Sequence, residues 1–199
     1  MSEPKDLNLN IYLSRWIISD GNYDDFRVGE TRKFALEFWA PTSLARTARR
    51  TTSLRQQRDY SYSICGELVF ATDDVSVIDC GVLAYSERKG EVQDGWAVGD
   101  FVRGDLMFCV DPFFYFESLC HIPSIPALIY DWQINSMEQD TTPYILSEVC
   151  GRPGYVRDET RRSFKAVRGT DENVATPPDS CPEFVLHCTK LGTVPRHKL

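Results

Sequence analysis

The amino-acid sequence predicts an all-β or β-dominated fold, in which a single curled antiparallel sheet forms a barrel or a sandwich. Apolar and polar residues alternate in several segments, which is the pattern of a half-buried strand. These segments are rich in Val, Ile, Phe and Tyr and are separated by Asp, Gly and Pro. Glycines also interrupt them where a closed sheet needs a bulge or a sharp bend, namely at Gly66, Gly81, Gly99 and Gly104.

Two strands are expected in the N-terminal part of the chain. The first covers residues 7–18, in which Leu and Ile alternate with Asn, Tyr and Ser before a turn at Gly21. The second covers residues 33–40, in which Phe and Leu alternate until Pro41 stops the pattern. We expect these two strands to pair with each other in antiparallel fashion.

Residues 42–59 differ in composition from the segments around them, because they combine five arginines with many Thr and Ser residues. We expect a solvated basic loop inserted into the sheet. The alternative is a short basic amphipathic helix with Leu44, Ala48, Thr51 and Leu54 on one face. The five basic side chains are Arg46, Arg49, Arg50, Arg55 and Arg58.

The strongest strand signal lies between residues 60 and 119, in the segments 60–71, 75–87, 96–111 and 113–119. The last segment contains four consecutive aromatic residues. On a strand, such residues point alternately to two faces. Either these rings pack between the sheet and residues 125–132, or Phe114 and Phe116 are displayed to a binding partner.

Further strands are expected at residues 127–135 and 144–149, the latter as the last strand of the main sheet. We therefore expect a β-rich core domain at residues 1–150. Residues 151–199 are expected to form a peripheral C-terminal extension that packs on this core, because Pro, Gly and charged residues are frequent there.

The net charge of −7 is concentrated in residues 61–150, which carry 3 basic and 15 acidic residues. Such a segment repels nucleic acids, whose binding depends on Lys and Arg, and attracts a basic partner. The acidic residues that we expect to contribute to binding are Asp73, Asp74 and Asp94.

Three function classes follow from these patterns. The first is a non-enzymatic module that binds a basic protein, in the manner of an immunity protein or toxin neutraliser. The second is an oligonucleotide-fold protein that binds single-stranded nucleic acid, with the five arginines on phosphates and aromatic rings on bases. The third is a cysteine-dependent enzyme that pairs Cys120 or Cys150 with His187.

Other classes lack their motifs. The sequence contains no G-x-S-x-G elbow, no phosphate-binding loop and no G-x-G-x-x-G fingerprint. The seven cysteines are an odd number at wide spacings and no secretory signal is present, so we expect reduced thiols. They include no C-x-x-C pair, so we expect no metal, and we expect no cofactor. We also expect a cytoplasmic protein without membrane association, because neither a signal segment nor a run of about 20 apolar residues is present. His197, close to the C-terminus, is expected to have no stable partner.

Overall fold

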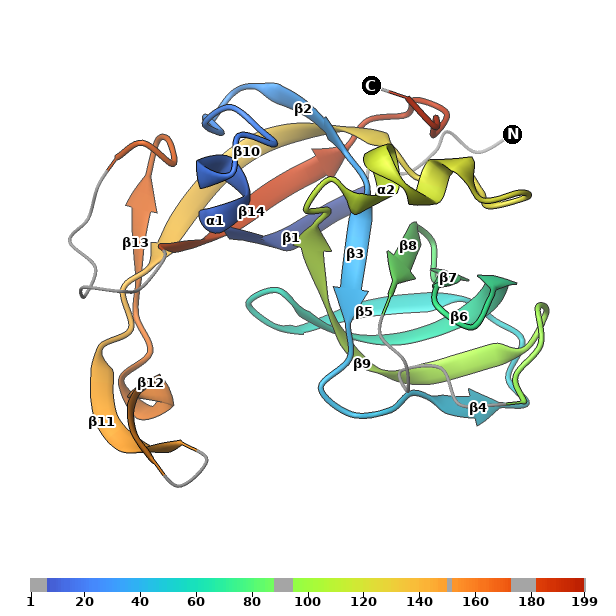
Figure 1. Ribbon diagram of the computed structural model, residues 1–199, viewed down its shortest axis with the longest axis horizontal. Coiled ribbons are helices and arrows are strands. Elements are labelled where there is room, and N and C mark those ends of the chain that lie inside the picture. Colours follow the sequence, from blue (N-terminus) through green and yellow to red (C-terminus); the bar gives the residue numbers. More distant parts are fainter. Residues whose placement is uncertain (1–6, 88–94, 150–151, 173–181, 199) are drawn as a thin grey trace.

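The computed structural model describes residues 7–87, 95–149, 152–172 and 182–198. Within these ranges the chain is built mainly from strands, which confirms the all-β prediction. Twelve of the described strands belong to one continuous sheet, and two more form a separate hairpin (Figure 1). No helix in the described ranges has the length and apolar character needed to cross a bilayer.

Five strands close into a barrel (Figure 1). Three strands that follow one another in the chain form a meander, and a strand from an earlier part of the chain lies next to it. A later strand closes the barrel by pairing with this earlier strand and with the first strand of the meander. In spatial order the barrel strands are β6 (Ser61–Ala71), β7 (Ser76–Asp79), β8 (Leu83–Ser86), β3 (Leu36–Trp39) and β9 (Phe101–Val110).

Gly66 allows two of these strands to approach each other closely. A Cβ atom at this position would lie 2.8 Å from the carbonyl oxygen of Asp79, a distance that real Cβ contacts do not show. The segment 75–87, which was expected to be one strand, is a hairpin of β7 and β8 that turns at Gly81. Gly81 has a φ of 105°, a conformation that favours glycine.

Two short strands extend the barrel wall: β4 (Ala45–Thr47) pairs with β9, and β5 (Ser53–Arg58) pairs with β6. The prediction of a loop or a short helix at residues 42–59 is therefore wrong. Leu44 is buried, and Leu54 packs against the main hydrophobic cluster. The polar residues of the segment mostly occupy its outward side, so their composition reflects solvent exposure rather than a lack of regular structure.

The rest of the large sheet continues from β9 through β1 (Leu7–Ser14), β14 (Glu183–Lys190), β10 (Tyr130–Asp140) and β13 (Phe164–Val167), with β2 (Thr31–Phe34) also on β10. Because β14 lies between β1 and β10, the expectation that the C-terminal part is wholly peripheral is wrong. Phe184 and Leu186 of β14 are buried in the main hydrophobic cluster.

The N-terminal strands differ from the prediction in extent and in pairing. Strand β1 stops at Ser14, and one helical turn, α1 (Trp16–Ser19), buries Ile17 while Trp16 stays exposed. The expected pairing of the first two strands is wrong, since β2 pairs with β10 and β3 pairs with β9. Two short contacts, β1 with β9 and β3 with β8, are parallel in an otherwise antiparallel sheet.

The aromatic segment 113–119 is helical and not a strand. It forms α2 (Phe114–Glu117), followed by the 3-10 turn η1 (Leu119–His121). Phe113 has a φ of 81°, which breaks the extended chain, and Asp111 accepts a hydrogen bond from the Tyr115 amide at 3.2 Å. Tyr115 is buried in a second, smaller hydrophobic cluster beneath this helix.

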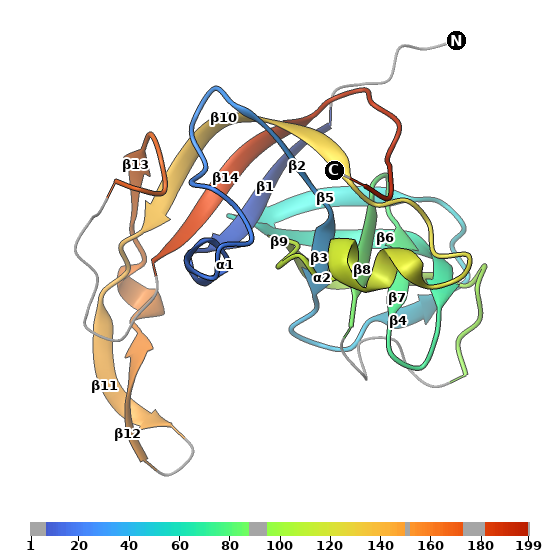
Figure 2. The same cartoon turned by 45° about the horizontal axis from the view of Figure 1, so that its top comes forward.

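The strands β11 (Tyr144–Val149) and β12 (Arg152–Arg157) form a hairpin that projects from the sheet in both views (Figures 1 and 2). The prediction of 144–149 as a strand of the main sheet is therefore wrong. Arg157 anchors the base of the hairpin through hydrogen bonds to Asp140 at 2.7 Å and to Tyr144 at 3.2 Å. A further 3-10 turn, η2 (Glu159–Arg161), follows.

Candidate functional site

The candidate site lies on the outer face of four adjacent strands, in the order β4, β9, β6 and β5. Residues that are directly opposite in an antiparallel pair share a face. One outward row contains Ala45, Arg103, Cys65 and Ser53, and the next contains Asp105, Ser63 and Arg55. The alternate residues Ile64, Val102 and Leu106 are buried in the barrel core, so these rows face away from it.

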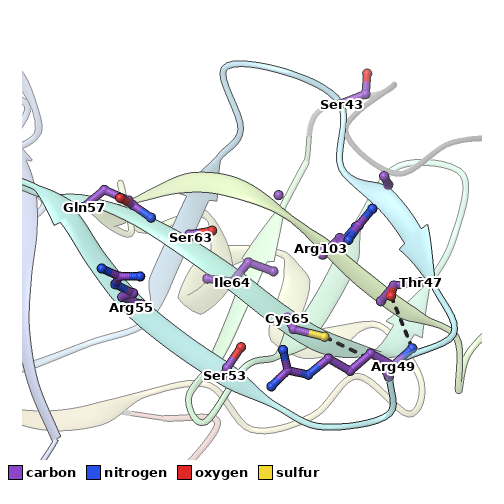
Figure 3. Close-up of a pocket in the computed structure, with 12 residues that line it drawn as sticks. Ser43, Thr47, Arg49, Ser53, Arg55, Gln57, Ser63, Ile64, Cys65 and Arg103 are labelled. Carbon is purple, nitrogen blue, oxygen red and sulfur yellow. Dashed lines mark hydrogen bonds between the residues drawn. The ribbon is translucent and has the colours of Figure 1, made fainter.

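These rows surround a polar groove of about 510 Å³ (Figure 3). This volume falls within the range of ligand sites, ~300–1,000 Å³. The described residues around it are Ser43, Ala45, Thr47, Arg49, Ser53, Arg55, Gln57, Ser63, Ile64, Cys65, Arg103 and Gly104.

Three arginines reach this groove from three different elements. Arg49 comes from the loop 48–52, Arg55 from β5 and Arg103 from β9, and Figure 3 shows them around Ser63 and Cys65. All three side chains are exposed. Among the described residues, no ion pair involves any of the three. Within the described part of the chain, their guanidinium donors are thus available to an anion from solvent.

Hydrogen bonds hold the loop that carries Arg49 against the sheet. The Arg49 amide donates to the Thr47 hydroxyl at 3.2 Å, and the Cys65 thiol donates to the Arg49 carbonyl at 3.7 Å. Both polar groups of the Arg49 backbone are therefore tied to residues that line the groove. This arrangement fixes the backbone position from which the exposed Arg49 side chain extends.

The other arginines of the predicted basic segment have different surroundings. Arg46 is ion-paired with Asp100, and Arg58 with Asp59 at 3.2 Å. Arg50 lies over the ring of Phe101, just beyond the groove. The basic segment therefore divides into arginines with internal partners and arginines that face the groove or its rim.

The structure does not bring the predicted aromatic residues to this groove. Phe114 is exposed on α2 and Phe116 packs against the smaller hydrophobic cluster, and both views show α2 apart from β4 (Figures 1 and 2). Arg103 was missed by sequence reasoning. Two features of the sequence could have pointed to it. Arg103 is the only Lys or Arg between Lys89 and Arg152, and it lies in a segment whose apolar and polar residues alternate as in a strand.

Several acidic residues in the described part of the central segment have partners within the protein. Asp100, Asp131 and Asp140 are ion-paired with the arginines Arg46, Arg196 and Arg157. The hydrogen bonds from Arg196 hold the pKa of Asp131 below its usual value.

Asp111 is also removed from the acidic surface, because it is buried. Its burial raises the pKa of this carboxyl to about 6, while hydrogen bonds from Tyr85 and Tyr115 act in the opposite direction.

Two of the three predicted acidic binding residues lie in the described part of the chain. Asp73 and Asp74 are exposed in the turn between β6 and β7, while Asp94 lies outside the described residues. Partial burial and the charge of Asp74 raise the pKa of Glu87, which follows β8. The turn is separate from the arginine groove in sequence and in sheet position.

Among the described residues, Cys120 and His187 of the predicted cysteine-dependent site contact other partners. The two ring nitrogens of His187 face Asn10 at 2.8 Å and Glu138 at 3.1 Å, and the Cys120 thiol donates to the Phe116 carbonyl at 3.0 Å. Cys150 lies outside the described residues. No group of three or more potential metal ligands occurs in the described part of the chain.

The expectation for His197 is wrong, because its Nδ1 atom lies 2.7 Å from the Tyr115 hydroxyl. This contact ties the C-terminal segment to α2.

No protein-family model matches the chain, and neither a curated protein nor a solved structure shows significant similarity to it. Barrels of this kind host many unrelated functions. The function therefore has to be inferred from the groove itself.

Proposed function

We propose that this protein binds single-stranded nucleic acid in the groove on the outer face of β4, β9, β6 and β5. The observation that carries this proposal is the convergence of Arg49, Arg55 and Arg103, none of which has an ion-pair partner among the described residues. A guanidinium presents a planar fork of donors that matches the oxygens of a phosphate.

The lining residues complement the arginines. Hydroxyl groups of Thr47, Ser53 and Ser63 add neutral donors, a type of group that commonly contacts phosphate and sugar oxygens. Arg55 and Arg103 start from strands that are two positions apart in the sheet, or roughly 10 Å. This spacing favours an extended ligand with several phosphates over a single small anion.

The local charge supports an anionic ligand despite the net charge of −7. Four arginines lie in or beside the groove, whereas the described rows that flank it contain two acidic residues, Glu67 and Asp105. Charges farther away than about 8 Å are strongly screened at physiological salt. The ligand therefore encounters an excess of positive charge.

A single strand fits this surface better than a duplex. Reading a duplex usually requires a helix or a two-stranded ribbon that enters a groove of the nucleic acid. The candidate site is instead a depression on a sheet, and sheet faces of five-stranded barrels serve as single-strand binding surfaces in the oligonucleotide fold. The basic-partner hypothesis remains a prediction, but the internal pairing of Asp100, Asp131 and Asp140 removes part of its support.

The proposal is tested by titrating a labelled twelve-nucleotide oligothymidine, dT12, at several salt concentrations. We expect a plot of the logarithm of the association constant against the logarithm of the salt concentration to have a slope of about −2. This value corresponds to ~0.7 for each of three contacted phosphates. The variant R49Q/R55Q/R103Q should lose most of this slope and most of the affinity.

The matched control is R27Q/R161Q/R168Q, which removes three exposed arginines elsewhere and changes the net charge by the same amount. This control should bind dT12 as the wild type does. Equal losses in the two triple variants would show that net charge, and not the groove, is responsible. No detectable binding of dT12 by the wild type at low salt would overturn the proposal.

A further inference from the structure

An aromatic ring borders the arginine groove at the end where the loop 48–52 crosses the sheet. Phe101 lies on the outward face of β9, two residues before Arg103, and is opposite Thr47 on one side and Glu67 on the other. Phe101 is half-buried, yet it belongs to neither hydrophobic cluster of the described residues. Core packing therefore does not account for an aromatic residue at this position.

The guanidinium of Arg50 lies over the Phe101 ring, with its central carbon 6.0 Å from the ring centroid. A flat base inserted between the ring and the guanidinium would stack on each of them at ~3.4 Å. The two groups would then be roughly 6.8 Å apart. Arg50 is exposed and is located in a loop, so a small movement of its side chain creates this space.

The energies favour a base over the existing contact. An exposed contact between a cation and an aromatic ring stabilises by ~0.5–1 kcal/mol. Stacking of a base on an aromatic side chain contributes ~1–3 kcal/mol, and arginine planes also stack on bases. A base inserted between Arg50 and Phe101 would therefore stack on the ring on one side and on the guanidinium on the other.

A second aromatic side chain lies farther along the same outward face. Trp39 of β3 is 37% exposed and is opposite Met107 on the same outward face of β9. Phe101 and Met107 are six positions apart along β9, which corresponds to roughly 20 Å along the strand. Phe101 and Trp39 therefore lie on opposite sides of Arg103 and Asp105 along this face.

We propose that Phe101 is a base-stacking residue, and that the groove is selective for a single strand carrying bases over a polyanion without bases. In this arrangement Arg103 and Arg49 contact phosphates while a base lies on Phe101 beneath Arg50. The inference rests on the proposed function of the groove. It specifies the class of ligand as a single-stranded oligonucleotide.

The test compares dT12 with inorganic polyphosphate of similar charge. F101L should weaken dT12 binding by about 5- to 150-fold and leave polyphosphate binding unchanged. R103Q should weaken the binding of both probes. F114L removes an exposed aromatic ring from α2, away from the groove, and should change neither affinity.

The variant F101Y keeps an aromatic ring and should retain dT12 binding, which separates loss of stacking from a disturbed fold. If wild-type protein binds dT12 and F101L binds it equally well, the stacking inference is wrong and the groove proposal stands. A similar loss of polyphosphate binding in F101L would also refute it. If neither probe binds to the wild type, the proposed function itself fails.

Discussion

The buried carboxyl group of Asp111 provides a sharp test of the structure through pH-dependent stability. Asp111 is 1% exposed, and its Oδ1 atom accepts hydrogen bonds from the Tyr85 hydroxyl at 2.5 Å and from the Tyr115 amide at 3.2 Å. Burial raises the pKa of Asp111 from 3.8 to about 6, and desolvation of the charged form is the largest cause. In the unfolded chain the carboxyl has its ordinary pKa.

The sign of the effect follows from the two pKa values. Between pH 4 and pH 6 the folded protein holds the Asp111 proton more tightly than the unfolded chain does, so its contribution to stability is present at low pH and is lost as pH rises. A pKa raised from 3.8 to about 6 corresponds to ~3 kcal/mol in the free energy of unfolding. This amount should disappear between about pH 4 and pH 7.

The variant D111N cannot ionise and isolates this contribution from that of other acids. Urea unfolding of both proteins at pH 4, 5, 6 and 7 gives the free energies, and the wild type should lose ~3 kcal/mol relative to D111N across this range. Parallel pH profiles would show that the carboxyl is not desolvated in solution. A wild type that gains stability relative to D111N as pH rises would reverse the argument.

Two further predictions concern the barrel and the groove. G66A places a Cβ atom 2.8 Å from the Asp79 carbonyl oxygen and should lower the free energy of unfolding, measured by urea denaturation, by ~1–3 kcal/mol. The control G192A adds a Cβ atom that meets no atom within 4 Å and should change this free energy little. D105N removes a carboxylate from the face that carries Arg103 and should tighten dT12 binding by about 2- to 5-fold; weaker or unchanged binding would show that Asp105 does not repel the ligand.

Strand alternation was the part of the fold that sequence reasoning predicted best. The segments 60–71 and 96–111 became β6 and β9, because inward and outward alternation is a local property of a strand. The segment 42–59 was predicted wrongly, since the short strands β4 and β5 expose most of their side chains. Their backbone hydrogen bonds depend on β9 and β6, which are distant in sequence.

The candidate site was predicted only in part. Arg49 and Arg55 were recognised because they lie in a basic segment, but Arg103 joins them only through the pairing of β9, β6 and β5. The four consecutive aromatic residues led to the prediction of Phe114 as a binding residue. Phe101, one aromatic residue in an ordinary strand, borders the groove instead.

The sequence by itself determined the β character of the chain, the uneven distribution of its charge and the lack of familiar catalytic motifs. Only the tertiary structure decided which charges remain available to a ligand. Arg46 and Asp100 are 54 residues apart, yet they form an ion pair, whereas the nearby Arg49 points into a groove with Arg103. The physical reason is that charge is carried by individual residues, while its neutralisation depends on contacts that the folded sheet creates between distant segments.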